Sequence, residues 1–406
     1  MAVGKHQYVK PNKERKKAKK RRHVFRNLLL TLMLLAGLYS IAVFSDIPFV
    51  ARLRTLYIET AMGTMTHQWL ATYFIPKSVI DEVMEQRFTI EQEQNELESG
   101  EWSVEHHTED IIETWDELEG EFDELYPDID ADTLRAYLRE HGDCLDADGY
   151  LVIDEADPGD GDTGIRTVQG DRVLALDTRN GIIIALLKDG DYVARLAIIK
   201  DPTHVGIALA PQYGSVGAVI QDICEHHGAV LGTNASGFYD PEGHGNGAEA
   251  YGFMISGGKK YCESVGSNYK MVGFDHSDRL LIGRYSDTSV FRDAVEFKPI
   301  LVLDGEKKIS GSAGWGIQPR TAIGQRKNGD VLLVVADGRA PGYSIGAKVG
   351  ELADIMLEYD AYQAINLDGG SSSVMYYNGR VISKPSAGDK VNGRRLPNAF
   401  LVMPQK

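Results

Sequence analysis

The sequence predicts an α+β protein: a mixed β-sheet domain with helices packed on it, preceded by one transmembrane helix and a helical acidic stalk. Three observations support this fold class. A charge-free apolar run lies near the N-terminus, helical apolar spacing and many acids follow it, and short β-rich runs with Gly and Asp turns fill the C-terminal part. The 406 residues, 43% of them apolar, suffice for a large core. We expect four regions, namely residues 1–26, 27–45, 46–150 and 151–406.

The first two regions combine a basic arm with an apolar run. Residues 1–26 contain 11 Lys and Arg and a single acid, Glu14, and residues 28–44 (LLLTLMLLAGLYSIAVF) carry no charge. A membrane-spanning helix needs roughly 17 to 25 apolar residues, and positive charge marks its cytoplasmic side. We therefore expect a single-pass anchor in the cell membrane, with a cytoplasmic N-terminus and an extracellular domain. A cleaved signal peptide is the alternative.

The rest of the chain is acidic and poor in cysteine. Beyond the arm, 32 Lys and Arg stand against 58 Asp and Glu. An acidic body repels phosphate backbones, which argues against nucleic acid as a partner. The three Cys have no C-x-x-C spacing and the His have no H-E-x-x-H spacing. We expect no metal site and no cofactor.

Residues 46–150 are predicted to form the helical acidic stalk. Apolar residues recur at helical spacing over 53–74, and acids dominate over 82–124. The stretch CLDADGYLVIDE, residues 144–155, has Asp, Gly and Glu at positions of a calcium loop, but it begins with Cys and has Val152 in ninth place. We interpret it as a turn before a strand.

The domain is predicted from short strands and from two helix-to-strand units. Clear strands are RVLALD, GIIIALL and YVARLAII. Residues 215–227 have a helical pattern that stops at Gly228, and the strand after them ends at Asn234. Residues 344–359 are again helical, and the strand AINL after them ends at Asp368.

Polar side chains at strand ends predict a site. The strand VLLVVA, residues 331–336, ends in Asp337, and ligands of strand-helix-strand sheets bind beyond the C-terminal ends of strands. If this strand and the AINL strand run parallel through a right-handed crossover, Asp337 and Asp368 share one edge of the sheet. Two carboxylates would then face a common cleft.

A hairpin signal adds a basic residue to this edge. Asn328-Gly329 favours a two-residue turn, which pairs Lys327 with Asp330 and, further along, Arg320 with Asp337. An ordinary surface ion pair is the alternative interpretation.

The loop after Asp368 supplies further candidate ligands. Gly369 and Gly370 allow backbone N–H groups to approach an anion, and Ser371, Ser372 and Ser373 add hydroxyl donors. Arg320 could bind a phosphate through two nitrogens. Carboxylates beside such a site suggest acid/base or nucleophilic chemistry on a sugar phosphate. A flexible Gly-Ser hairpin loop is the plain alternative.

Four ordered motifs carry a family resemblance. NASGFYD, PRTAIG, VVADGR and NLDGGSSS begin at residues 234, 319, 334 and 366, and LPNAFLV fits as a last strand. In this order and spacing they resemble the phosphodiester glycosidase family, over roughly residues 165–404. The resemblance implies hydrolysis of a sugar joined through its anomeric carbon to a phosphodiester, without a cofactor.

Position by position, the resemblance also implies a set of site residues. Its catalytic candidates are Asp368, Asp337, Arg320 and Asn234. Arg320 and the amides of 369–372 would bind the phosphate, and the two aspartates would act as acid, base or nucleophile. Its substrate-binding candidates are Gly369, Gly370, Ser371, Ser372, Thr321, Gly237, Phe238 and Arg339.

The whole pattern resembles a bacterial, Gram-positive surface protein. We expect a sugar-phosphate polymer or glycoconjugate as substrate, in the cell wall or in exopolysaccharide. Two other hypotheses remain open at this point: a noncatalytic glycopolymer-binding or assembly protein on the same fold, and a structural membrane component that acts through its stalk.

Overall fold

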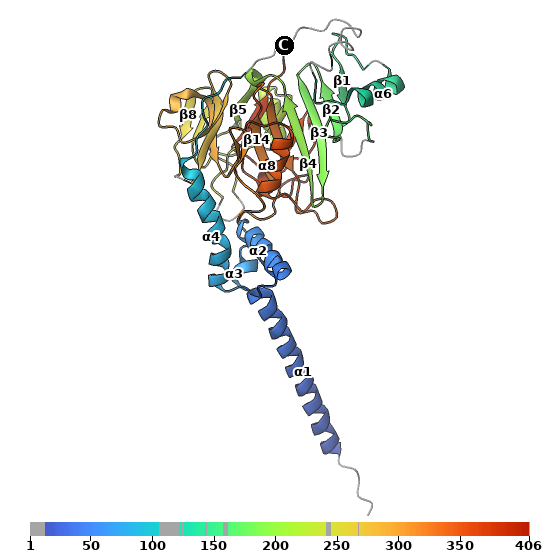
Figure 1. Cartoon of the computed structure of the whole chain (residues 1–406), viewed down its shortest axis with the longest axis vertical. Coiled ribbons are helices and arrows are strands. Elements are labelled where there is room, and N and C mark those ends of the chain that lie inside the picture. The colour runs from blue at the N-terminus through green and yellow to red at the C-terminus, as the bar shows by residue number, and fades with distance from the viewer. Residues whose placement is uncertain are drawn as a thin grey trace, which may run out of the picture.

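A computed structural model describes residues 13–104, 122, 126–142, 144–156, 161–240, 245–266 and 268–405. Figure 1 shows a long N-terminal helix that leads, through a group of short helices, to a body of β-sheets. The C-terminus lies at the end of the body away from the long helix. Much of the acidic run over 82–124 lies outside the described residues.

The N-terminal helices are α1 (Lys13–Phe44), α2 (Pro48–Met62), α3 (Trp69–Thr72) and α4 (Lys77–Glu93), followed by the short turn η1 (Gln94–Glu96). Within α1, the span Lys20–Phe44 is long and apolar enough to cross a membrane, judged by length and composition. α2 begins at Pro48, whose missing N–H and fixed φ suit the first helical position.

Three antiparallel sheets form the body. The large sheet has the order β1 (Val152–Asp154), β2 (Arg172–Asp177), β3 (Ile182–Asp189), β4 (Tyr192–Ile199), β15 (Val331–Ala336), β14 (Arg320–Gln325), β16 (Gln363–Asn366), β12 (Ile300–Leu303) and β13 (Glu306–Lys307). The second has the order β10 (Leu280–Gly283), β9 (Lys270–Asp275), β11 (Phe291–Phe297), β7 (Met254–Ser256) and β8 (Lys259–Cys262). The third has the order β18 (Arg380–Val381), β17 (Met375–Tyr377), β6 (Leu231–Asn234), β19 (Asn398–Val402) and β5 (Val205–Leu209).

Further helices and turns connect and cover the sheets: α6 (Ala131–His141), η2 (Pro202–His204), α7 (Ile220–His227), η3 (Thr288–Val290), α8 (Val349–Glu358) and η4 (Gly370–Ser372). α7 ends at Gly228 in the left-handed region, as predicted. Both α7 and α8 begin about five residues later than the apolar pattern indicates. Before α8, Ala347 instead pairs with Gln318, and before α7, Ala218 pairs with Leu396.

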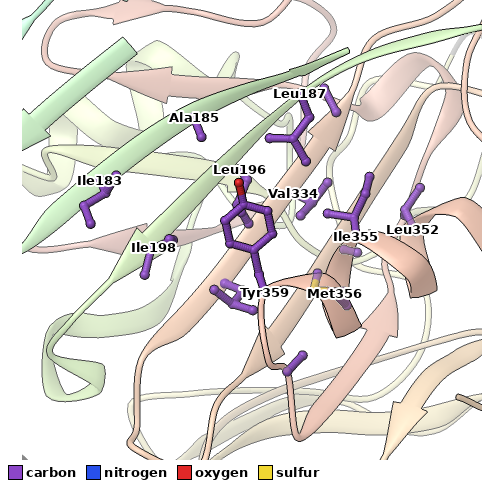
Figure 2. Close-up of a cluster of buried hydrophobic side chains, with 14 of the residues drawn as sticks. Ile183, Ala185, Leu187, Leu196, Ile198, Val334, Leu352, Ile355, Met356 and Tyr359 are labelled. Carbon is purple, nitrogen blue, oxygen red and sulfur yellow. The ribbon is translucent and has the colours of Figure 1, made fainter. Parts of the chain in front are cut away.

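The large sheet is buried on both faces, which explains its continuous apolar strands. One face packs against α8 and α6, and Figure 2 shows Leu352, Ile355 and Met356 of α8 beside the strands that carry Leu196 and Val334. The other face packs against the second and third sheets in a separate core. The predicted α+β class with helices packed on a sheet is therefore confirmed, but the described strand pairs are antiparallel where a mixed sheet was predicted.

The predicted hairpin register is wrong by one residue. Arg320 pairs with Ala336 instead of Asp337. Arg326 and Asp330 close a three-residue loop, in which only Gly329 has a positive φ, of 98°. A two-residue type I′ turn would need positive φ at both central residues, so Asn328 does not form one.

The prediction that the strands before Asp337 and Asp368 run in the same direction is confirmed. β14 is antiparallel to both β15 and β16, so the two outer strands run the same way with β14 between them. Asp337 and Asp368 follow the C-terminal ends of these two strands and therefore lie at the same edge. They do not face the same space, as described below.

The segment expected to be a separate stalk packs against the body. The Gln94 side chain bonds both the N–H and the carbonyl of Ile300 in β12. The Ser99 amide donates to the Ile282 carbonyl of β10, and the Trp102 ring contacts Tyr362. The described part of residues 46–104 is thus joined to the sheets.

The expected domain boundary near residue 150 also requires correction. Leu134, Tyr137 and Leu138 of α6 belong to the same core as Val334 and Leu352. Asp128 forms buried ion pairs with Arg326 and Lys200. Residues before 151 therefore complete the domain core, which the acidic composition of this stretch conceals.

Candidate active site

One cleft of about 500 Å³ lies at the edge of the large sheet. Most of the predicted site residues line it: Gly237, Phe238, Arg320, Arg339, Asp368, Gly369, Gly370, Ser371 and Ser372. Aromatic and polar residues from other elements complete the wall: Tyr239, Tyr251, Tyr269, Phe297, Trp315, Gln318 and Asn366. Strands and strand ends that are far apart in the sequence thus meet around one space.

Asp368 reaches the cleft because the backbone beneath it is fixed. The Asn234 side-chain amide donates to the Asp368 carbonyl at 2.6 Å, and the Thr321 hydroxyl donates to the Asn234 side-chain oxygen at 2.7 Å. Asn234 and Thr321 are fully buried. They were expected to line the pocket, but they lie beneath it and hold the loop that carries Asp368.

The carboxyl group of Asp368 is easier to protonate than an ordinary aspartate. Burial raises its pKa to about 6, against the lowering effects of the Ser372 hydroxyl, the nearby Arg394 and the Gly369 amide. These three partners therefore do not fully offset the cost of burying the negative charge. A group with this pKa can exchange a proton near neutral pH.

Asp337 does not face the cleft, contrary to the prediction. Its carboxylate is paired with Arg195 and accepts hydrogen bonds from the Tyr343 hydroxyl at 2.8 Å and the Lys384 amide at 2.7 Å. The one-residue register shift is the reason, because it places Ala336 rather than Asp337 opposite Arg320. Asp337 is a structural anchor between β4, β15 and the 384 loop.

Replacing Asp337 with Asn tests this correction. The change leaves the buried Arg195 without its anionic partner, and breaking such a pair costs about 3 kcal/mol of unfolding free energy. We expect lower stability in chemical denaturation, while turnover per folded molecule stays within about 10-fold of the parent. Unchanged stability together with a loss of turnover as deep as that of an Asp368 variant would contradict the assignment.

Arg320 lies in the wall of the cleft and is bound by main-chain carbonyls. Its Nε donates to Ala347 at 3.2 Å, and its Nη2 donates to Trp315 at 2.7 Å and Gly316 at 3.0 Å. No hydrogen bond among the described residues uses Nη1. Arg320 was expected to bind a phosphate through two nitrogens, but only Nη1 remains available for this. Burial and the nearby Arg87 and Arg339 lower the pKa of Arg320, which remains a cation at neutral pH.

The glycine-serine loop is less open to an anion than its sequence suggests. The Gly370 amide donates to the Pro319 carbonyl at 2.8 Å, and the Ser372 amide donates to the Gly369 carbonyl at 3.1 Å. The loop needs glycine for two reasons. A Cβ at Gly369 would lie 2.9 Å from the Pro319 oxygen, and Gly370 has a φ of 62°. Its main function is to turn sharply after Asp368.

Arg339 covers this loop with a second guanidinium group. Nη1 donates to the Ser371 hydroxyl at 3.0 Å, and Nη2 donates to the Gln318 side chain at 3.0 Å. Burial, with a smaller effect of Arg394, lowers the pKa of Arg339. The residue has a φ of 57°, a strained value for a non-glycine residue that recurs at functional sites.

Several cleft residues were missed by the sequence analysis. Asp240 lines the cleft with Arg394 as its ion-pair partner, and the Arg394 guanidinium stacks 4.4 Å from the Phe238 ring centroid. Asp240 closes the motif NASGFYD, which could have signalled it. Lys298 also lines the cleft and is paired with Glu91 at 2.9 Å.

The N-terminal helices contribute a whole side of the cleft, which no motif predicts. Arg87 of α4 and the loop Gly63, Thr64, Met65 and Thr66 after α2 line it. This side is held by Glu59, which accepts from the Gly314 amide at 2.9 Å, and by Gln318, which donates to the Thr60 carbonyl at 2.9 Å. The Arg87 guanidinium also lies 5.0 Å from the Trp315 ring centroid.

Among the described residues, no group of three or more His, Cys, Asp or Glu side chains could hold a metal ion. In the calcium-loop-like stretch, Asp146 and Asp148 are both paired with Arg179. That stretch forms the predicted turn before β1.

The cleft therefore places one carboxylate of raised pKa opposite an excess of positive charge. Asp240 is balanced by Arg394, and Glu91 balances both Arg87 and Lys298. Arg320 and Arg339 have no carboxylate partner among the described ion pairs. Such a space suits an anionic ligand with a reactive centre near Asp368.

Comparison with known proteins shows a family likeness. Residues 227–403 match the model of the phosphodiester glycosidase family, so this part of the chain is similar to that family. The chain is 26% identical over 202 residues to N-acetylglucosamine-1-phosphodiester alpha-N-acetylglucosaminidase of Bos taurus, covering 44% of this chain and 37% of the relative. It is 29% identical over 174 residues to an uncharacterized SPbeta prophage-derived protein of Bacillus subtilis, covering 39% of this chain and 26% of the relative. The chain spans well under half the length of these relatives.

A solved structure with a similar fold is the zebrafish N-acetylglucosamine-1-phosphodiester alpha-N-acetylglucosaminidase catalytic domain, described as auto-inhibited by its pro-peptide. It superposes with a TM-score of 0.47 at 19% identity and covers 55% of this chain and 82% of that chain.

Proposed function

We propose that the protein is a hydrolase that cleaves sugar-1-phosphodiesters at the bond between the anomeric carbon and the phosphate oxygen. The observation that carries this proposal is the position of Asp368 in a cleft with the guanidinium groups of Arg320 and Arg339, which form no ion pair with a carboxylate of the described residues. A phosphodiester has one negative charge beside a carbon that can be attacked, which matches this arrangement. The match of residues 227–403 to the phosphodiester glycosidase family supports the same chemistry.

In the proposed reaction, Asp368 accepts a proton from a water molecule that attacks the anomeric carbon. The bond from that carbon to the phosphate oxygen breaks, and its electron pair stays on the phosphate. The products are the free sugar and a phosphomonoester, and the proton passes from Asp368 to solvent. Arg320 and Arg339 stabilise the charge that grows on the departing phosphate. A phosphate leaves readily, so this step needs less help from an acid than ordinary glycoside cleavage does.

We also propose where the protein acts. The basic arm before the apolar span of α1 favours a cytoplasmic N-terminus and an extracellular catalytic domain. An enzyme in this place would meet cell-wall or exopolysaccharide polymers with sugar-1-phosphate links. The name of the mammalian relatives gives N-acetylglucosamine-1-phosphate esters as the first substrates to try.

The Arg339 side chain provides a test of phosphate binding. Replacing Arg339 with Met removes a charge-assisted contact to the substrate anion, and we expect KM to rise about 10-fold or more. The guanidinium group is partly desolvated, but the residue as a whole is exposed, so stability should change little. Steady-state kinetics with Arg139→Met, on the exposed face of α6, provides the matched control. Equal KM values for the two variants would show that Arg339 does not bind the substrate anion.

The function itself is tested by release of reducing sugar. The full chain is incubated with a panel of sugar-1-phosphodiesters beside Asp368→Asn and the control Asp222→Asn, which changes an exposed aspartate of α7. We expect turnover by the parent and the control and none by the Asp368 variant. Full turnover by Asp368→Asn would contradict the proposal, and binding without turnover by the parent would favour a noncatalytic glycopolymer-binding protein.

A further inference from the structure

The helices next to α1 expose an unusual number of large apolar side chains. We call this set the membrane-proximal surface; it consists of Ile47, Phe49, Leu53, Tyr57, Met65, Trp69, Tyr73 and Phe74. Tyr73 is 80% exposed and Phe49 is 71% exposed. A contiguous exposed apolar patch in a folded protein normally marks an interaction site.

On α2 the exposed residues form one stripe. Phe49, Leu53 and Tyr57 are spaced four residues apart and therefore lie on one face. The side of the helix that carries Ile58 and Ala61 packs against α3 and α4 in a small core of its own. α2 thus has an internal apolar side and, beside it, a second apolar side that is largely exposed.

This surface lies beside the apolar span of α1. The Tyr39 hydroxyl donates to the Phe74 carbonyl at 2.8 Å. Tyr39 is five residues before Phe44, the end of the span, which corresponds to about 7.5 Å along a helix. The residues after the C-terminal end of α3 therefore lie beside the last turns of α1. Figure 1 shows α2 and α3 at the junction of α1 with the body.

The charges in this region suit a lipid headgroup layer. Between residues 45 and 77 the exposed cations are Arg52 and Lys77, and the acids are Asp46 and the fully buried Glu59. Trp and Tyr are enriched where a membrane meets water, and amphipathic helices bury their apolar face about 5 to 10 Å into that layer. Cations beside such a face are attracted to anionic lipids.

The same surface reaches the cleft. Met65 is 61% exposed and lines the cleft together with Thr64 and Thr66. We propose that the membrane-proximal surface lies in the headgroup layer of the bilayer spanned by α1, and that it holds the cleft opening at the lipid surface to receive a lipid-linked sugar phosphodiester. The position of the surface stands on its own contacts, whereas the choice of substrate rests on the proposed function.

Fluorescence quenching tests the position of the surface without any need for activity. The full chain is reconstituted in vesicles of phosphatidylcholine and phosphatidylglycerol whose acyl chains carry bromine near the headgroup. α1 contains no Trp, Trp102 and Trp315 are buried, and Trp115 is replaced with Phe in every protein compared, so Trp69 is the expected reporter. We expect strong quenching in the parent, weak quenching in Trp69→Phe, and its return when Tyr73→Trp is added to that variant. Equal quenching in the parent and Trp69→Phe, or no return with Tyr73→Trp, would overturn the proposal. A surface covered by a second copy of the chain would give this contradicting result.

A pair of substrates tests the lipid-linked part. The hexadecyl ester of N-acetylglucosamine-1-phosphate is embedded in the same vesicles, and the methyl ester is supplied in water. For the double variant Phe49→Ser/Tyr73→Ser we expect about 10-fold slower turnover of the hexadecyl ester and unchanged turnover of the methyl ester. Equal turnover of the hexadecyl ester by parent and variant would refute the lipid-linked choice. If the parent turned over neither ester, the proposed function and the substrate choice would both be contradicted, while the quenching would still decide the position of the surface.

Discussion

Replacing Asp368 with Asn is expected to lower turnover by about 10³-fold or more, because the amide cannot accept a proton from the attacking water. The pH profile of the parent should show the same group. The pKa of Asp368 is raised to about 6 by burial, so kcat/KM should fall as the pH drops below about 6 and the base becomes protonated. Steady-state rates between pH 4.5 and 8 measure both effects. A variant that keeps its rate, or a parent with a flat profile through this range, would exclude Asp368 as the base.

The same substitution should make the protein more stable at neutral pH. A raised folded-state pKa means that the folded protein binds this proton more tightly than the unfolded chain does. The unfavourable contribution of the carboxylate is therefore absent below about pH 4, grows between pH 4 and 6, and is complete above pH 6. The difference between this pKa of about 6 and that of an ordinary aspartate limits the gain in Asp368→Asn to roughly 3 kcal/mol. Denaturant unfolding of the parent and of Asp368→Asn should show this gain at pH 7.5 and little or none of it at pH 4.

Replacing Arg320 with Met is expected to cause the second large effect, because it acts on the fold and on the site together. The carbonyls of Trp315 and Gly316 would lose their donor, and the Ala347 carbonyl would keep only the Gln318 amide. A buried acceptor left without a donor lowers the free energy of unfolding by about 1 to 3 kcal/mol. Because water from the cleft can bond some of these carbonyls, we expect a total loss of about 3 kcal/mol. The cleft would also lose a cation, so KM should rise. Denaturant unfolding and steady-state kinetics measure the two losses.

Arg320→Lys separates the two effects. The lysine keeps the charge, but its donors all lie on one nitrogen, so it cannot reach carbonyls of two separate loops as the spread guanidinium nitrogens do. We expect intermediate stability and a KM closer to that of the parent. If Arg320→Met were as stable as the parent, the carbonyl contacts would not hold the wall of the cleft.

The edge of the sheet could be predicted because strand ends are strongly marked in this sequence. The buried strands VLLVVA and AINL end at once in aspartate, and the glycines after Asp368 announce a sharp turn. This information fixed which residues gather at one edge. It could not fix which side chains face the cleft, because a one-residue change of register reverses the face of every residue in a strand. The three-residue loop around Asn328-Gly329 shifts the register by one residue, and Asp337 consequently faces Arg195.

The N-terminal side of the cleft could not be predicted, for a different physical reason. Arg87 lies in a helix whose composition is that of an ordinary solvated surface, and its place depends on contacts more than 200 residues away in the sequence. Glu59 seemed to be one acid among many, yet it is fully buried and bonds the Gly314 amide. Long-range docking of this kind leaves no periodic signal in the chain.

The most direct test of the central claim is the position of the oxygen that water adds. The full chain is incubated with a sugar-1-phosphodiester in ¹⁸O-labelled water, and both products are analysed by mass spectrometry, with a correction for exchange at the anomeric hydroxyl. Attack at the anomeric carbon beside Asp368 predicts ¹⁸O in the released sugar and none in the phosphomonoester. Label in the phosphomonoester would show attack at phosphorus and would contradict the account.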